Sequence, residues 1–124
     1  MKNLLALAAI GEVIAGLLVL VYPPIVVKLL FGAEISGVGV VMSRIAGMSL
    51  IALGFACWPG DTATRALCGM LIYSALAAVY LTCLGLGGEW SGKLLWPAAA
   101  CHAVLTILLV RAWFQKRKSS KGKT

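Results

Sequence analysis

Four side chains that can carry charge or protons lie inside long apolar stretches of this 124-residue chain: Glu12, Arg44, Tyr80 and His102. A charged side chain in the hydrocarbon core of a membrane costs at least about 2.5 kcal/mol unless it finds a partner, water or the interface. We therefore expect Glu12 and Arg44 to form an ion pair, with Tyr80 and His102 completing an intramembrane polar cluster. Such a cluster either fixes helix packing or serves as a proton or substrate site.

The sequence indicates no catalytic chemistry. It contains no paired catalytic carboxylates, no nucleophile beside a base and no phosphate-binding loop, and a single histidine cannot hold a metal or haem without a second donor. We therefore expect neither an enzyme nor a cofactor or metal site. The four cysteines lack zinc-type spacing and are expected to be buried apolar side chains, with Cys83 and Cys101 the one pair that could be bonded: Cys57, Cys68, Cys83 and Cys101.

The composition excludes an ordinary soluble domain. Hydrophobic residues make up 61% of the chain and charged residues only 12%, with a mean hydropathy of +0.99. Soluble proteins average about 25% charged residues. The chain is therefore expected to be a multi-pass membrane protein.

Four stretches are long and apolar enough to cross a bilayer, at about residues 3–22, 35–57, 65–86 and 94–113. Pro23 and Pro24 end the first span, and the apolar spacing that follows predicts a short interfacial helix over about 24–31. Small residues recur along the spans and favour close helix packing. The predicted fold is an all-α, four-transmembrane-helix bundle in a domain of residues 1–114, followed by a basic cytoplasmic tail at 115–124.

Positive charge predicts the orientation of the chain. The net charge is +7, and six of the eleven Lys and Arg residues lie in the last fourteen positions. Because cytoplasmic segments of membrane proteins carry excess Lys and Arg, both termini are expected to be cytoplasmic. The same cluster favours contact with anionic lipid headgroups over nucleic-acid binding, and the residues expected to make that contact are Arg111, Lys116, Arg117 and Lys118.

The segment from residue 23 to residue 58 resembles a known group of small bacterial membrane proteins. It reads PPIVVKLLFG and then SRIAGMSLIALGFACW, and its proline, LFG, R-x-x-G and LG patterns resemble the DoxX-like and DUF4345-type four-helix proteins. The resemblance covers less than a third of the chain. It implies the four-helix architecture and a location in the inner membrane of a bacterium, rather than an activity.

The expected function follows largely from the scarcity of polar groups. A stand-alone carrier or enzyme would show several convergent polar side chains, and this chain offers one cluster. We therefore expect an accessory or structural subunit that packs against larger membrane-protein subunits. Two alternatives remain open: a small proton-coupled transporter acting as a homo-oligomer, and a helper in membrane quinone or redox chemistry.

Overall fold

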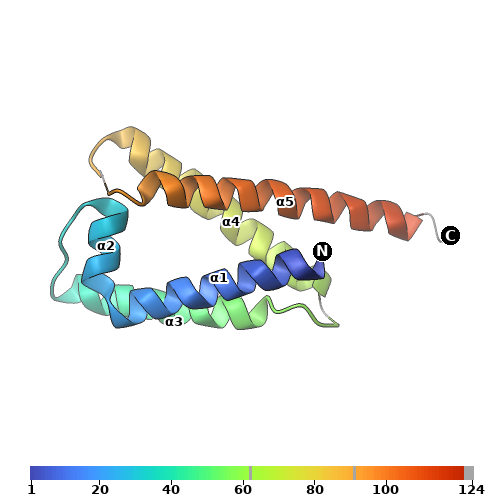
Figure 1. The fold of residues 1–124 in the computed structure, drawn as a ribbon, viewed down its shortest axis with the longest axis horizontal. Coiled ribbons are helices and arrows are strands. Elements are labelled where there is room, and N and C mark those ends of the chain that lie inside the picture. The colour runs from blue at the N-terminus through green and yellow to red at the C-terminus, as the bar shows by residue number, and fades with distance from the viewer. Residues whose placement is uncertain (62, 91, 122–124) are drawn as a thin grey trace.

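The computed structural model describes residues 1–61, 63–90 and 92–121, and in those residues it contains five α-helices and no strand (Figure 1). Four of the helices are long and apolar enough to cross a membrane. The predicted all-α class and the four membrane-length helices are therefore confirmed. The five are α1 (Lys2–Val21), α2 (Pro23–Phe31), α3 (Val38–Ala56), α4 (Ala63–Gly87) and α5 (Leu95–Lys121).

The short helix α2 begins and ends where the sequence predicts. A single residue, Tyr22, separates it from α1, and Pro23 and Pro24 occupy its first turn, where a missing backbone N–H costs nothing. Gly32 ends the helix in the left-handed conformation, with φ 73°. Figure 1 shows α2 running across the end of α1 rather than along it.

Two helix boundaries differ from the prediction by three residues or more. Helix α3 begins at Val38, three residues later than expected, because Gly37 takes a positive φ of 53° and turns the chain into the helix. Helix α5 continues through the basic segment to Lys121, so that its 27 residues extend about 40 Å. The remaining tail residues, 122–124, lie outside the described part of the chain.

The long helices associate as two antiparallel pairs, α1 with α3 and α4 with α5. Glycines bring the backbones of α1 and α3 together. A Cβ on Gly16 would lie 2.6 Å from the carbonyl oxygen of Gly47, and a Cβ on Gly54 would lie 2.7 Å from that of Ala9. Between transmembrane helices, close packing of this kind takes the place of the hydrophobic effect as the main driving force for association.

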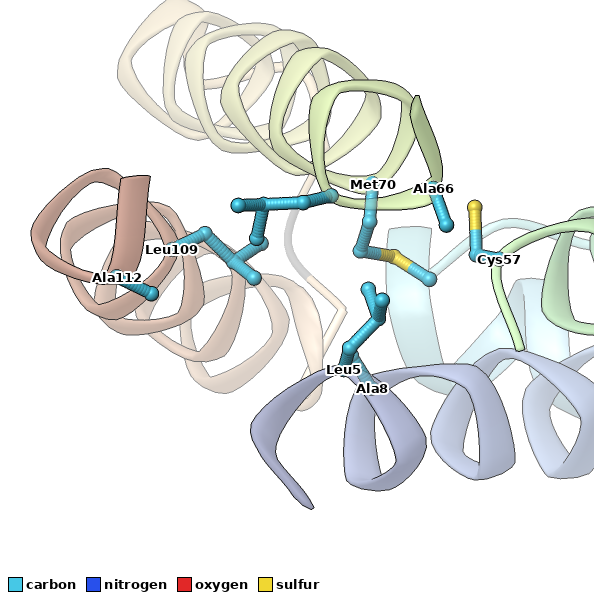
Figure 2. Close-up of a cluster of buried hydrophobic side chains, with 8 residues drawn as sticks. Leu5, Ala8, Cys57, Ala66, Met70, Leu109 and Ala112 are labelled. Carbon is cyan, nitrogen blue, oxygen red and sulfur yellow. The ribbon is translucent and has the colours of Figure 1, made fainter. Parts of the chain in front are cut away.

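The two pairs meet at the end of the molecule that holds the N-terminus and the end of α5 (Figure 1). Figure 2 shows the cluster that joins them, in which Leu5 of α1 faces Met70 of α4 and Leu109 of α5. Toward α2 the pairs diverge. The predicted compact packing is thus found within each pair, while the two pairs touch mainly at this end.

Candidate functional site

A groove of about 960 Å³ lies between the two helix pairs. It is open rather than sealed, and its walls come from α1, α4 and α5, with α2 at one end. Nearly all of the wall is aliphatic. The polar side chains that line it come from three different helices: Glu12 of α1, Tyr73 and Tyr80 of α4, and Cys101 and His102 of α5.

Glu12 lies on the wall of this groove because of how α1 packs. The glycine face of α1 is held against α3, which directs the neighbouring face, with Glu12, toward α4. The Glu12 residue is only 6% exposed. A buried carboxyl group without a partner is costly, so the groups that surround Glu12 determine what it can do.

Tyr73 is the polar neighbour of Glu12. Its hydroxyl is close enough to interact with the carboxyl group, and of the two groups it is the one with a permanent O–H to donate. Its ring packs edge-on against the His102 imidazole, with ring centroids 5.7 Å apart and an interplanar angle of 81°. Glu12, Tyr73 and His102 therefore form a continuous polar contact across α1, α4 and α5, hereafter the polar triad.

Tyr80 does not join the triad directly. It lies two turns beyond Tyr73 on α4, about 10 Å further toward α2, and lines the groove with 65% of its surface exposed. Three of the four side chains of the predicted cluster therefore border one groove. Of these, His102 contacts Tyr73, which in turn lies beside Glu12. Tyr80 lies further along the same wall.

The predicted ion pair between Glu12 and Arg44 is absent from the described residues, whose one ion pair joins Lys28 and Glu34. The reason is the register of α1 on α3. Gly16 faces Gly47, and Glu12 lies four residues to one side of that crossing while Arg44 lies three residues to the other. The two are therefore at least roughly 10 Å apart along the helix axis.

Arg44 is exposed and does not line the groove. It lies six residues inside α3, or about 9 Å from the start of the helix, a distance that a long arginine side chain can largely cover by extending toward the headgroups. Arg44 therefore does not need the buried partner that the sequence predicted for it.

Tyr73 was not among the residues predicted for the polar cluster. The residue lies ten positions inside α4 and Glu12 ten positions inside α1, and both of these helices start at the end where the two pairs meet. Counting from those helix starts places the two side chains at equal depth. The predicted cluster placed Arg44 and Tyr80 there instead.

Two buried polar atoms of the α4–α5 pair have no hydrogen-bond partner among the described residues, Ser74 Oγ and His102 Nδ1. The imidazole therefore keeps unused hydrogen-bonding capacity beside the groove. No group of three metal-binding side chains occurs in the part of the chain that the structure describes. All four cysteines are free, so the suggested bond between Cys83 and Cys101 is not formed.

No family model, curated protein or solved structure matches the chain. The arrangement of the groove is therefore the basis for any functional conclusion. A carboxyl group, a phenol and an imidazole in an apolar wall can hydrogen-bond the polar end of a membrane-soluble molecule or exchange a proton with it.

The predicted lipid-contact residues lie on the far part of α5, at the end where the two pairs meet. Arg111, Lys116, Arg117 and Lys118 are all exposed there. Lys116 donates a hydrogen bond to the hydroxyl of Thr64 at the start of α4. The guanidinium of Arg117 lies over the Trp113 ring, 5.7 Å from its centroid. The segment is therefore helical and carries a dense cluster of exposed basic side chains. Clusters of this kind favour contact with anionic headgroups.

Proposed function

We propose that this chain is an integral membrane protein that binds a lipid-soluble small molecule in the groove between its two helix pairs. One observation carries the proposal: the buried carboxyl group of Glu12, with Tyr73 beside it, faces a largely apolar groove of about 960 Å³. Small-molecule sites are typically apolar clefts with a few convergent polar groups. The ion pair with Arg44, which was the other role expected for Glu12, is not formed among the described residues.

The size of the groove suits a small molecule. Ligand sites usually measure about 300–1,000 Å³, and the groove is at the upper end of that range. Because the groove is open and the surrounding helices are of membrane-spanning length, the molecule would enter sideways from the lipid.

The other hypotheses relate to this proposal in different ways. A proton-coupled transporter and a helper in quinone chemistry both require a small-molecule site inside the membrane, and the groove would serve either. The accessory-subunit hypothesis is supported by a separate observation, since α3 is the least buried of the four long helices and offers a surface to larger membrane-protein subunits or to a second copy. It remains the second candidate.

The proposal includes a location and an orientation. We place the protein in a bacterial inner membrane with both termini in the cytoplasm. The support is that Lys2, Arg65 and the basic part of α5 lie at one end of the molecule, whereas Lys28 and Lys93 lie near α2 at the other.

A substitution that obstructs the groove tests the proposal. A Cβ on Gly11 would have no other atom within 4 Å, and Gly11 lines the groove next to Glu12 in the chain, so Gly11→Phe should obstruct this part of the groove without disturbing helix packing. Met48→Phe is the matched control, because Met48 is 55% exposed on α3 and lies outside the groove. Each protein is extracted from its membrane in a mild detergent and weighed by native mass spectrometry.

We expect a small-molecule adduct of one per chain on the parent and on Met48→Phe, and its loss from Gly11→Phe. Equal adducts on all three proteins, or none on any, would overturn the small-molecule proposal. Co-purification of larger foreign polypeptides with all three, without a small-molecule adduct, would favour the accessory-subunit hypothesis instead.

A further inference from the structure

We propose that the groove selects lipophilic cations, whose positive centre would lie beside Glu12. This inference rests on the proposed small-molecule function and adds the charge class of the ligand. The starting observation is an imbalance of charge: among the described residues that line the groove, Glu12 is the one carboxylic acid, and no Lys or Arg accompanies it.

The charged groups nearest the groove do not correct this imbalance. Lys28 of α2 is held by Glu34 at 3.0 Å, and that pair is exposed. Arg44 lies on the other side of the Gly16–Gly47 crossing and does not line the groove. His102 lies beyond Tyr73, so a positive group in direct contact with Glu12 would come from the bound molecule.

The aromatic rings of the groove also suit a cation. Tyr73 lies beside Glu12 and Tyr80 further along the same wall, and an aromatic ring attracts a positive centre within about 6 Å of its centroid. Aliphatic side chains form most of the rest of the wall. Coulomb attraction is stronger in such surroundings than in water, so a carboxylate here should discriminate strongly between cation and anion.

A purely structural role for Glu12 makes a different prediction. If the contact between Glu12 and Tyr73 served only to join α1 to α4, as polar contacts between membrane helices often do, the groove would bind apolar molecules without regard to charge. Charge selectivity is therefore the property that separates a recognition site from a packing contact.

Two probes of the same shape and opposite charge, tetraphenylphosphonium and tetraphenylborate, measure that selectivity. Equilibrium dialysis is run on the protein in nanodiscs, and binding to empty nanodiscs is subtracted. We expect saturable binding of the cation at one per chain and no saturable binding of the anion. Glu12→Gln, which keeps an acceptor for the Tyr73 hydroxyl but removes the charge, should weaken binding of the cation roughly tenfold or more. Gly11→Phe should abolish it.

Binding of the two probes to the parent protein is enough to show whether the groove prefers the cation or the anion. The inference therefore stays testable even if Glu12→Gln does not fold. Equal binding of both probes, or unchanged binding of the cation to a folded Glu12→Gln protein, would overturn the inference. The proposed function would survive either result if the adduct were still lost from Gly11→Phe. Absence of both probe binding and any small-molecule adduct would overturn the two together.

Discussion

Gly16 of α1 and Gly47 of α3 face each other with their backbones in contact. A Cβ added to Gly16 would lie 2.6 Å from the carbonyl oxygen of Gly47, and one added to Gly47 would lie 2.7 Å from that of Gly16. This crossing sets the register of the α1–α3 pair. It thereby places Glu12 on the groove wall and Arg44 beyond it.

Alanine at either glycine should force α1 and α3 apart, because most of the atoms that a Cβ would meet, including the nearest one in each case, are backbone atoms that cannot rotate away. We expect Gly16→Ala and Gly47→Ala each to lower the free energy of unfolding by about 1–3 kcal/mol, the usual cost of overpacking. Thermal unfolding in detergent measures it. Gly11→Ala is the control on the same helix, where open space lets the higher helix propensity of alanine raise stability by up to about 1 kcal/mol. Equal effects at Gly11 and Gly16 would contradict the crossing.

Gly92 holds α2 against the loop that follows α4. A Cβ there would overlap the carbonyl group of Leu30, and next to this contact the Leu94 N–H donates to the Leu29 carbonyl at 2.7 Å. Gly92→Ala should therefore loosen α2. A spin label at Leu29 should become more mobile, whereas Gly87→Ala, in open space, should leave the label unchanged. A label that reports the same mobility in both variants would show that α2 is not held there.

Much of the fold was predictable because each decisive signal is local. A span is a run of apolar residues, and α2 is delimited by Pro23, Pro24 and Gly32, whose backbone restrictions act in any context. The start of α3 was missed by three residues because the turn at Gly37 depends on a positive φ that the sequence permits but does not demand.

The candidate site was less predictable, because nearly every face of these helices is apolar. In a soluble protein the polar face of a helix points outward and reveals its orientation, but in lipid an apolar face can be directed either to the membrane or to a neighbour. The partner of Glu12 depended on the register set by Gly16 and Gly47. The sequence predicted Arg44 as that partner, whereas the crossing separates the two residues.

The orientation of the chain in the membrane stays a prediction. A reporter fused after residue 124, or inserted in the loop at residues 58–61, should behave as cytoplasmic. A cysteine introduced at Glu89 in the loop after α4 should react with an impermeant reagent added from outside, once the four native cysteines have been replaced. Labelling of Glu89 only in broken cells would reverse the orientation, but it would not affect the groove.

The place of α2 in the membrane interface also stays a prediction. Ile25 and Leu29 are exposed on this helix, at 58% and 40%, and Lys28 is exposed between them. If α2 lies on the membrane surface, spin labels at Ile25 and Leu29 should be accessible to lipid-soluble oxygen, and one at Lys28 to a water-soluble nickel reagent. Losing the exposed ion pair of Lys28 with Glu34 should cost little. Equal accessibility to both reagents at all three positions would mean that α2 does not lie in the membrane interface.

The separation of Glu12 from Arg44 predicts that their substitutions act independently. Effects at sites more than about 7–10 Å apart without shared partners usually add within roughly 0.3–0.5 kcal/mol. Glu12→Gln, Arg44→Gln and the double variant should therefore give a coupling energy within that margin. Thermal unfolding of the four proteins in nanodiscs measures it. A buried ion pair would instead make each single variant costly, by about 3–5 kcal/mol, and let the double variant recover much of the loss.

Tyr73 supplies the positive control for this cycle, because its hydroxyl lies beside the Glu12 carboxyl group. Removing the hydroxyl in Tyr73→Phe and the charge in Glu12→Gln should produce a measurable coupling of about 0.5 kcal/mol or more, since residues in one hydrogen-bonded contact are not independent. A strong coupling of Glu12 to Arg44 together with none to Tyr73 would reverse the assignment. Glu12 would then be a structural ion-pair residue directed away from the groove, and the basis for proposing a ligand site there would be lost.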